Sequence, residues 1–253
     1  MYKVTNYIDG KECTESNESI NIINPSYGIK IGEVIYATKV STDKAIEAAA
    51  KTFKTWSKTG LSYRAELMMK LRQGVINRSE EIIDICVNEA GKTRPDAEAE
   101  LDRAIQALTH TAGVQHFYPS IMSPNVAGGI DITDVRYPIG VVAGCGPFNF
   151  PILIPILHAS MAIVTGNTFI AKPSEKVPSI SRLYADIFKE SGFPDGCYSV
   201  LNGGKDVVEQ LVSHEKVAGL AFIGSTPVAK SLKILGVQNN TKVQALGGGK
   251  NHM

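Results

Sequence analysis

Long apolar runs are missing from this sequence. The longest, Pro151 to Val164, is interrupted by His158 and Ser160 and is shorter than the ~18 apolar residues that suggest a membrane-spanning helix. Residues 1–6 also lack the apolar stretch of a secretory signal. We therefore expect a soluble, cytoplasmic protein without a membrane partner, in which residues 151–164 form a buried helix.

Cysteine is scarce as well. It occurs at Cys13, Cys86, Cys145 and Cys197, with no CxxC pair and no histidine close to a cysteine. This scatter argues against a zinc site and against a disulfide framework, and it suits a reducing compartment. No metal site is expected.

A surplus of one charge is also absent. The 26 basic and 25 acidic residues leave a formal charge of +1, which implies no broad attraction to nucleic acid or to anionic membranes. The 43% hydrophobic and 20% charged residues are typical of a soluble globular protein with a sizeable core. A length of 253 residues fits one large domain or two smaller ones.

The patterns that are present change along the chain. Residues 1–35 contain short β-rich pieces between turn signals such as Asp9-Gly10 and Asn24-Pro25, which predicts a small sheet or an extended arm. Helical spacing follows. Helix starts are predicted near Ser41, Ser62, Ser79 and Pro95.

The second half of the chain alternates between strands and helices. Ile130, Ile132 and Val135 first suggest strand pairing. Strands are then predicted at 140–143, 168–171, 198–201, 219–223 and 242–246, with helices at 152–165, 179–191, 206–214 and 227–235. Short apolar strands alternating with amphipathic helices indicate a parallel sheet of βαβ units, so the predicted fold class is α/β.

The strand-to-helix turns of such a sheet are candidate sites, because ligands bind at the carboxyl ends of the strands. These turns span residues 145–151, 172–176, 202–205 and 224–227. No G-x-G-x-x-G fingerprint follows a strand, and Gly247-Gly248-Gly249 has no helix after it. The pattern alone leaves nucleotide binding open.

Five motifs in and near these turns resemble the aldehyde dehydrogenase superfamily, in order and at that family's spacing. They are Pro147-Phe148-Asn149-Phe150-Pro151, Lys172-Pro173-Ser174-Glu175, Gly192-Phe193-Pro194-Asp195-Gly196, Phe222-Ile223-Gly224-Ser225-Thr226 and Leu246-Gly247-Gly248-Gly249-Lys250. That family binds a nicotinamide cofactor on a Rossmann-like sheet without the usual glycine fingerprint, which accounts for the missing fingerprint here.

The resemblance extends over the whole chain and implies its domain organisation. Residues 1–120 would form the amino-terminal helical part of the NAD-binding domain, and residues 121–138 the strands of an oligomerisation arm. Residues 139–253 would form the Rossmann-like NAD-binding sheet, flanked by helices. The catalytic domain is expected to be absent from the chain, and the full-length enzyme is expected to be a homo-oligomer.

One branch of the superfamily is the most similar. Arg136 to Val142, Gly166 to Phe169 and Gly249 to His252 most resemble methylmalonate-semialdehyde dehydrogenases. Members of that branch oxidise a semialdehyde with NAD, lose carbon dioxide and release an acyl-CoA. The resemblance implies NAD as the cofactor, CoA as a co-substrate of the full-length enzyme, and a small aldehyde as the substrate.

Two residues are assigned to the aldehyde by this resemblance. Asn149 would donate its side-chain amide to the oxyanion of the hemithioacetal, a contact typically worth ~3 kcal/mol of barrier. Its alternative is a turn-forming asparagine that satisfies local backbone groups. Arg103 would hold the substrate's carboxylate by two parallel hydrogen bonds. Its alternative is a surface arginine paired with Asp102 or Glu100.

The adenosine side of the cofactor is assigned to the turn after residue 171. By resemblance, Lys172 and Glu175 would hold the ribose, and the Glu175 carboxylate would disfavour the extra phosphate of NADP. Alternatively, Glu175 is an ordinary charge in the first turn of a helix. Lys176 either lies near the ribose or is a solvated lysine.

The remaining cofactor contacts come from three other segments. Ser225 precedes Pro227, which suits the first turn of a helix, so its hydroxyl and the exposed N–H groups would bind the pyrophosphate. A plain helix cap is a compatible reading. Gly146 and Phe148 are assigned to the nicotinamide end, with a core position as the alternative for Phe148. Gly247 is also assigned to the cofactor.

Two departures from the family pattern bear on the chemistry. Most members carry a glutamate base just before the Leu-Gly-Gly-Lys motif, whereas Ala245 and Leu246 stand there here. Neither accepts a proton, so the thioester would pass to a thiol such as CoA. The family's nucleophilic cysteine follows the Gly-Lys motif, beyond Met253, and Cys145 has no histidine nearby to activate it. The isolated chain is therefore expected to be inactive.

Two other functions stay open at this point. A hydrolytic aldehyde dehydrogenase, with its base supplied elsewhere, would turn over without CoA. A naturally short, non-catalytic nucleotide-binding module would need no cysteine at all.

Overall fold

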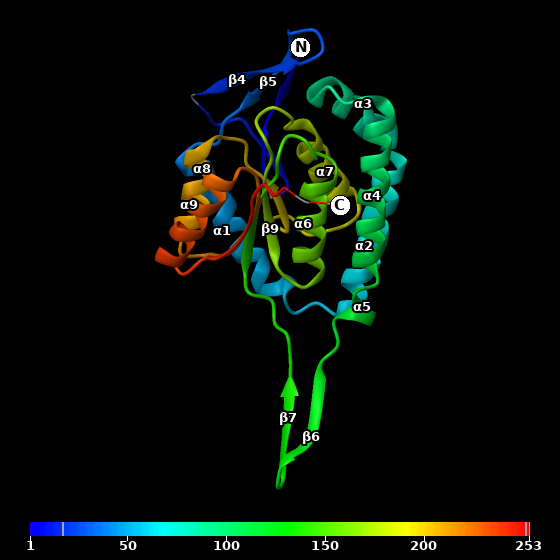
Figure 1. The fold of residues 1–253 in the computed structure, drawn as a ribbon, viewed down its shortest axis with the longest axis vertical. Helices are drawn as coiled ribbons and strands as arrows, with labels where there is room; N and C mark the ends of the chain where they lie inside the picture. The colour runs from blue at the N-terminus through cyan, green and yellow to red at the C-terminus, as the bar shows by residue number, and fades with distance from the viewer. Residues whose placement is uncertain (17, 251, 253) are drawn as a thin grey trace.

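A computed structural model describes residues 1–16, 18–250 and 252. A seven-stranded sheet forms the centre of the molecule, with helices on both faces (Figure 1). In sheet order, the strands are β12 (Lys242–Leu246), β11 (Val217–Ile223), β8 (Val141–Cys145), β9 (Thr168–Lys172), β10 (Tyr198–Val200), β2 (Asn6–Ile8) and β3 (Lys11–Cys13).

The five strands from β8 to β12 are parallel, and the direction in which the sheet grows reverses at β8. The chain first adds β9 and β10 on one side of β8, and then adds β11 and β12 on the other side. This confirms the predicted α/β class with its Rossmann-like sheet. In an open parallel sheet, ligands bind at the carboxyl ends of the strands next to such a reversal.

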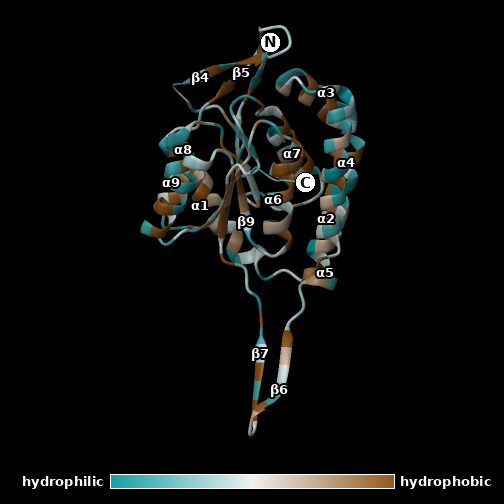
Figure 2. Cartoon of the chain, viewed as in Figure 1, coloured by the Kyte–Doolittle hydropathy of each residue, from teal (hydrophilic) through white to brown (hydrophobic). Residues whose placement is uncertain are grey.

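The helices lie in three layers. One face of the sheet carries α1 (Lys39–Trp56), α8 (Lys205–Ser213) and α9 (Thr226–Gln238), and the other carries α6 (Leu153–Val164) and α7 (Ser179–Glu190). An outer layer over α6 and α7 consists of α2 (Leu61–Asn77), α3 (Ser79–Ala90) and α4 (Arg94–Ala112), followed by the short α5 (Val114–Phe117). The central strands are among the most hydrophobic segments (Figure 2).

The longest apolar run forms α6, as predicted. Ile156 and Ile163 of this helix are fully buried between the sheet and the outer layer. The predicted start of α1 is wrong by three residues. Thr38 is the N-cap, and it exchanges hydrogen bonds with the buried Ser41, which we had expected to be the cap itself. In the described part of the chain, every helix is too short or too polar to cross a membrane.

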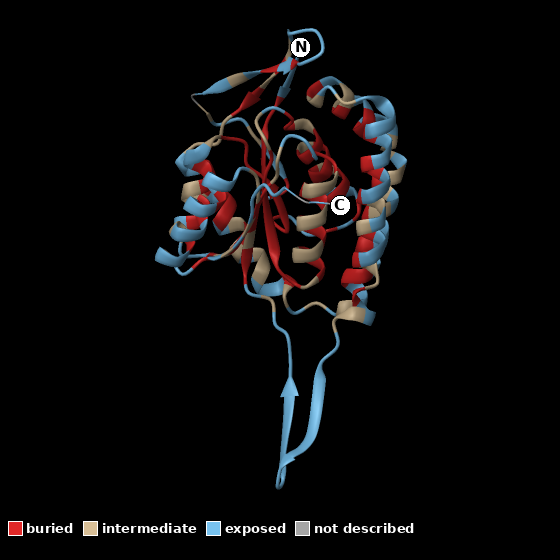
Figure 3. Ribbon diagram, viewed as in Figure 1, coloured by how far each residue is buried: buried red, intermediate tan, exposed pale blue. Residues whose placement is uncertain are grey.

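A two-stranded hairpin projects from the body of the molecule (Figure 1). It consists of β6 (Ile121–Ala127) and β7 (Ile130–Asp134), and every residue of both strands is exposed (Figure 3). The exposed side chains include Ile121, Met122, Val126, Ile130 and Ile132. A lone hairpin of this kind is only marginally stable in water, and in a single copy of the chain its apolar side chains face solvent.

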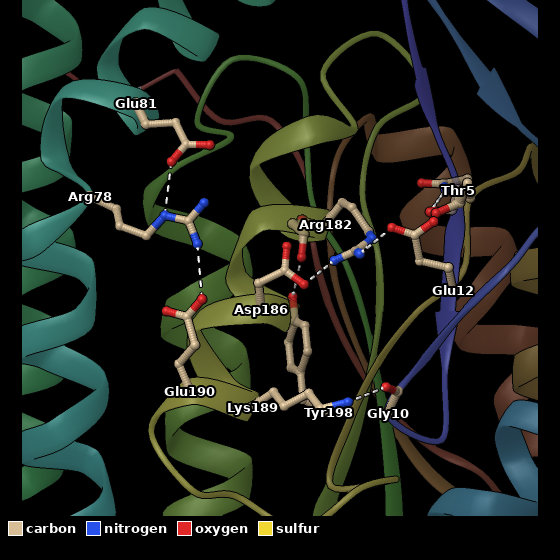
Figure 4. A network of polar contacts seen from close by, with 12 residues as sticks. Thr5, Gly10, Glu12, Arg78, Glu81, Arg182, Asp186, Lys189, Glu190 and Tyr198 are labelled. Atoms are coloured by element: carbon tan, nitrogen blue, oxygen red, sulfur yellow. Dashed lines mark hydrogen bonds and ion pairs between the residues drawn. The ribbon is translucent and has the colours of Figure 1, made fainter.

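The amino-terminal residues divide between two sheets, whereas the sequence suggested one small sheet or arm. β1 (Tyr2–Val4), β5 (Ile29–Ile35) and β4 (Ser19–Asn24) form a separate three-stranded sheet. β2 and β3 instead extend the central sheet: β2 pairs antiparallel with β10, and β3 pairs antiparallel with β2. Figure 4 shows the contacts that fix them to α7: Arg182 donates to Glu12 at 2.8 Å, and Lys189 donates to the Gly10 carbonyl oxygen at 2.7 Å.

Candidate functional site

The register of the parallel strands brings the predicted turns to one edge of the sheet. Cys145 at the end of β8 lies beside Lys172 of β9 on one side and Phe222 of β11 on the other. The N–H of Gly146 donates to the Lys172 carbonyl oxygen at 3.2 Å, which joins the first two turns. Residues far apart in the sequence therefore meet next to the reversal of the sheet.

A cleft of about 750 Å³ opens between these turns. This volume is typical of small-molecule binding sites. Seven predicted site residues line the cleft: Gly146, Phe148, Asn149, Lys172, Glu175, Ser225 and Gly247.

The other two predicted residues lie in pockets that adjoin the cleft. Lys176 lines a pocket of about 360 Å³ that shares Phe148 and Glu175 with the cleft, and its Nζ lies 4.7 Å from the centroid of the Phe148 ring. Arg103 lines a pocket of about 490 Å³ that shares Asn149 with the cleft. Asn149 thus stands where the cleft and the Arg103 pocket meet.

Lys172 and Glu175 form an ion pair at the wall of the cleft. The Lys172 side chain is buried, and its Nζ lies 3.6 Å from the Glu175 carboxylate. Glu175 lies in the turn, four residues before α7 begins, so its alternative reading as a charge in the first turn of that helix is wrong. Tyr36 is close by: burial raises the pKa of this phenol, and the charge of Glu175 raises it further.

The amino terminus of α9 forms the opposite wall. Ser225 is the N-cap residue, but its side chain makes no capping hydrogen bond, and Pro227 lies in the first turn as predicted. The Thr226 hydroxyl oxygen instead accepts the N–H of Gly248 at 3.2 Å. A Cβ at Gly247 would lie 2.8 Å from that oxygen, so only glycine fits this approach. The Ser225 hydroxyl and the helix dipole are available to an anion.

The structure bears on the alternatives for Phe148 and Arg103. Phe148 is 53% exposed, so it is not a core residue. The Arg103 guanidinium donates to the side chain of Gln106 at 3.2 Å, whereas Glu100 is buried and pairs with Lys92. Arg103 is therefore an exposed arginine, as its alternative reading has it, but within the described residues it forms no ion pair with Glu100 or Asp102.

The cysteine nearest to the site is Cys145. Burial raises the pKa of its thiol to about 11, although the nearby charge of Lys172 acts in the opposite direction. The thiol is therefore protonated at neutral pH, which agrees with the expectation that it is not a nucleophile. In the described part of the chain, no group of three or more His, Cys, Asp and Glu side chains could hold a metal ion.

One side of the cleft was missed by the sequence reasoning. Val208 of α8 and Leu232 of α9 line it together with Phe222, and Glu209 of α8 adds a second carboxylate. The only signal was the third turn, 202–205, from which we named no residue. Which faces of α8 and α9 turn toward the cleft is set by how the two helices pack, and local sequence does not reveal it.

Known proteins match this chain over nearly its whole length. The model of the aldehyde dehydrogenase family matches residues 13–253. Malonate-semialdehyde dehydrogenase of Bacillus pumilus is 38% identical over 248 residues, which are 98% of this chain and 51% of that protein.

Two solved structures match over the whole chain. Methylmalonate-semialdehyde dehydrogenase of Oceanimonas doudoroffii has a TM-score of 0.96 at 37% identity, and it is matched over 100% of this chain and 52% of its own. A putative methylmalonate-semialdehyde dehydrogenase of Sinorhizobium meliloti 1021, complexed with NAD, has a TM-score of 0.96 at 35% identity and the same coverage. The chain spans about half the length of these relatives. Asn251, part of a motif that suggested this branch, lies outside the described residues.

Proposed function

Because the chain belongs to the aldehyde dehydrogenase family, we propose that it forms the NAD-binding half of a CoA-acylating semialdehyde dehydrogenase. The observation that supports this most is the cleft at the reversal of the sheet, which gathers seven residues assigned to the cofactor and the aldehyde. The proposal concerns an enzyme of the length of its relatives, about twice the length of this chain.

The residues of the cleft fit NAD from the adenosine end to the pyrophosphate. Lys172 and Glu175 would hold the ribose, with the adenine against the apolar side chains of Val208 and Leu232. The Ser225 hydroxyl and the first N–H groups of α9 would bind the pyrophosphate, and Gly247 allows the close approach beside them. The Glu175 carboxylate would repel the 2′-phosphate of NADP, so NAD is the preferred cofactor.

The reacting end would lie at Asn149. When bound, NAD supplies the acceptor for the hydride of the substrate. Gly146 and Phe148 would position the nicotinamide, and the Asn149 amide would donate to the oxygen that becomes negative in the transition state. Arg103, across the shared pocket, would bind a carboxylate of the aldehyde. Lys176, whose Nζ lies over the Phe148 ring, would contact the cofactor from the adjoining pocket.

The acyl group would leave by transfer to CoA. Ala245 and Leu246 occupy the place of the glutamate base that hydrolytic family members use, and Leu246 is 49% exposed at this edge of the sheet. No proton acceptor there activates water. The thiolate of CoA would then attack the thioester carbonyl, and the cysteine of the enzyme would leave as a thiolate.

The hairpin supports an oligomer. Its exposed apolar strands would bury their side chains against a second copy of the enzyme. We place the protein in the cytoplasm, because its buried cysteines are unpaired thiols.

Cofactor binding is the direct test for this chain. We expect millimolar NAD to raise the melting temperature of the chain, and NADP to raise it less. The Lys230→Ala variant, changed on α9 away from the cleft, should behave like the unaltered chain. A melting temperature that NAD leaves unchanged would contradict the cofactor assignment.

The acyl acceptor needs the enzyme at the length of its relatives. Turnover of a carboxylated semialdehyde should depend on CoA, and an equal rate without CoA would favour the hydrolytic alternative. The coding sequence after codon 253 addresses the non-catalytic alternative: continuation into a cysteine motif contradicts it, and a stop codon in the native gene supports it.

A further inference from the structure

Two buried carboxylates of the outer layer lie at the amino termini of the two inner helices. Glu89 of α3 is 3% exposed and accepts the N–H of Ser179, at the start of α7, at 3.2 Å. Glu100 of α4 is 4% exposed, and one of its oxygens accepts the N–H groups of Ile152 and Leu153, at the start of α6, each at 2.8 Å. The first N–H groups of a helix have no partner within it, and the helix dipole favours a negative charge there.

Only one of these helix ends carries a residue assigned to the aldehyde. Residues 150–152 connect Asn149 directly to α6. The second oxygen of Glu100 accepts a hydrogen bond from Lys92 at 2.5 Å, and the Nζ of Lys92 also lies 4.5 Å from the centroid of the Phe150 ring. Glu100 therefore fixes the backbone at the start of α6, and Lys92 contacts the Phe150 side chain in the turn before it.

A third contact completes this support. The hydroxyl of Tyr184, a fully buried residue of α7, donates to the carbonyl oxygen of Ile152 at 2.9 Å. The backbone of Ile152 is thus bonded through its N–H to α4 and through its oxygen to α7. Both backbone groups of this residue are thus fixed by side chains from other elements, and the turn lies where two pockets meet.

We propose that Glu100 and Lys92 are positioning residues for Asn149. They fix the turn so that the Asn149 amide stays at the junction of the cleft and the Arg103 pocket. The catalytic value of this positioning rests on the proposed function, because an oxyanion donor lowers a barrier only when it is held in place beforehand. The rigidity of the turn can be measured without a substrate.

The test is backbone ¹⁵N relaxation of the 253-residue chain, read at Asn149 and Phe150. In the unaltered chain we expect order parameters in the rigid range, about 0.85. Glu100→Ala should lower both below about 0.6, because it removes the cap of α6 and the partner of Lys92. Glu100→Gln should restore them in large part, since its amide oxygen still accepts both N–H groups.

Glu89→Ala is the matched control, because it deletes an equally buried helix-capping carboxylate at α7. It should loosen Ser179 and leave Asn149 rigid. A folded Glu100→Ala chain with a rigid Asn149 overturns the proposal. Equal loosening of Asn149 in both variants also overturns it, because the effect would then be general destabilisation.

A further variant covers the case in which Glu100→Ala does not fold. Lys92→Met keeps the cap of α6 but removes the charge between Glu100 and the Phe150 ring, and it should lower the order parameters of Phe150 and Asn149. Unchanged values there overturn the proposal. NAD titration of the unaltered chain is read separately at Ser225: an absence of shifts defeats the proposed function and leaves the positioning result intact.

Discussion

Burial sets the protonation state of two side chains that could otherwise take part in acid–base or nucleophilic chemistry. The Cys145 thiol, at the edge of the cleft, has its pKa raised to about 11 by burial. The His158 imidazole, on α6, has its pKa lowered to about 4 by burial, and its Nδ1 has no hydrogen-bond partner within the described residues. Both are neutral at pH 7, and each state has a measurable consequence.

Cys145 should resist alkylation. At pH 7.5 we expect iodoacetamide to modify it at least about 100-fold more slowly than the partly exposed Cys13, because so little of the buried thiol is ionised. Peptide mass spectrometry over time measures both rates. Cys13→Ser should leave the chain almost unlabelled at early times, whereas rapid labelling of Cys145 would revive it as a nucleophile.

His158 should make stability depend on pH. Its folded pKa lies below the unfolded value of about 6.5, so the unfolded chain binds the extra proton and stability falls as the pH falls from 6.5 toward 4. From pH 7.5 to 5 the loss due to this residue is about 2 kcal/mol. Urea unfolding at the two pH values measures it. His158→Leu should flatten the profile, and an unchanged profile in that variant would assign the effect to other groups.

Glu175 should control the choice of cofactor. Glu175→Gln keeps the shape of the side chain but removes its charge, so NAD should bind about 10-fold more weakly and the preference over NADP should narrow. Isothermal titration with both nucleotides measures this. Glu209→Gln removes another carboxylate that lines the same cleft. If the two variants change the preference equally, the ribose assignment of Glu175 is wrong.

At the scale of the helices and strands, Thr38 offers a prediction that the sequence did not. Thr38→Ala removes a capping box from α1 and should cost about 1 kcal/mol, or about 2–4 °C in melting temperature. Thr55→Ala, on the exposed side of the same helix, loses only a bond to the Thr52 carbonyl oxygen and should cost less. Calorimetry on both chains compares them, and equal costs would mean that the cap contributes nothing.

The strands and helices after residue 139 were predictable because their pattern is local. Alternation of apolar strands with amphipathic helices is visible within a few residues, and each predicted strand from 140–143 to 242–246 has its counterpart from β8 to β12. The cap of α1 was missed because Thr38 lies before the apolar periodicity begins. The placement of β2 and β3 was missed because β10, the strand that joins β2 to the central sheet, lies almost 200 residues away, and no local pattern records such a pairing.

The site, like the fold, contains residues that were predictable from the sequence and residues that were not. The turns that carry Asn149 and Ser225 were predicted to lie at the site because a turn after a strand has a fixed place in a parallel sheet, whereas the roles of the two residues came from the family resemblance. Val208 and Leu232 were not found, because apolar positions on α8 and α9 look alike whether they face the core or the cleft. The supporting contacts of Glu100 needed the outer helical layer in place before they could be seen.

At the scale of the whole molecule, the projecting hairpin is a feature that a single copy does not explain. We expect the chain to sediment as a species larger than one copy at micromolar concentration. Ile130→Lys with Ile132→Lys should shift it to a monomer, because two charges would enter the buried face. Ile234→Lys with Val237→Lys changes two exposed apolar residues of α9 and is the control. A monomer in the unaltered chain would contradict self-association through the hairpin.

The position of β2 and β3 in the central sheet also affects how the protein folds during its synthesis. They are synthesised almost 200 residues before β10, yet β2 pairs with that strand, and the N–H of Asn202 donates to the Asn6 side chain at 2.7 Å. At a translation rate of 5–20 residues per second, they wait about 10 to 40 seconds for that partner. During that wait β2 can pair with β3, but the edge of β2 that pairs with β10 in the folded protein stays open to other nascent chains. An open strand edge is a template for pairing between chains, so the order of synthesis makes aggregation of nascent chains a hazard that the folded structure no longer shows.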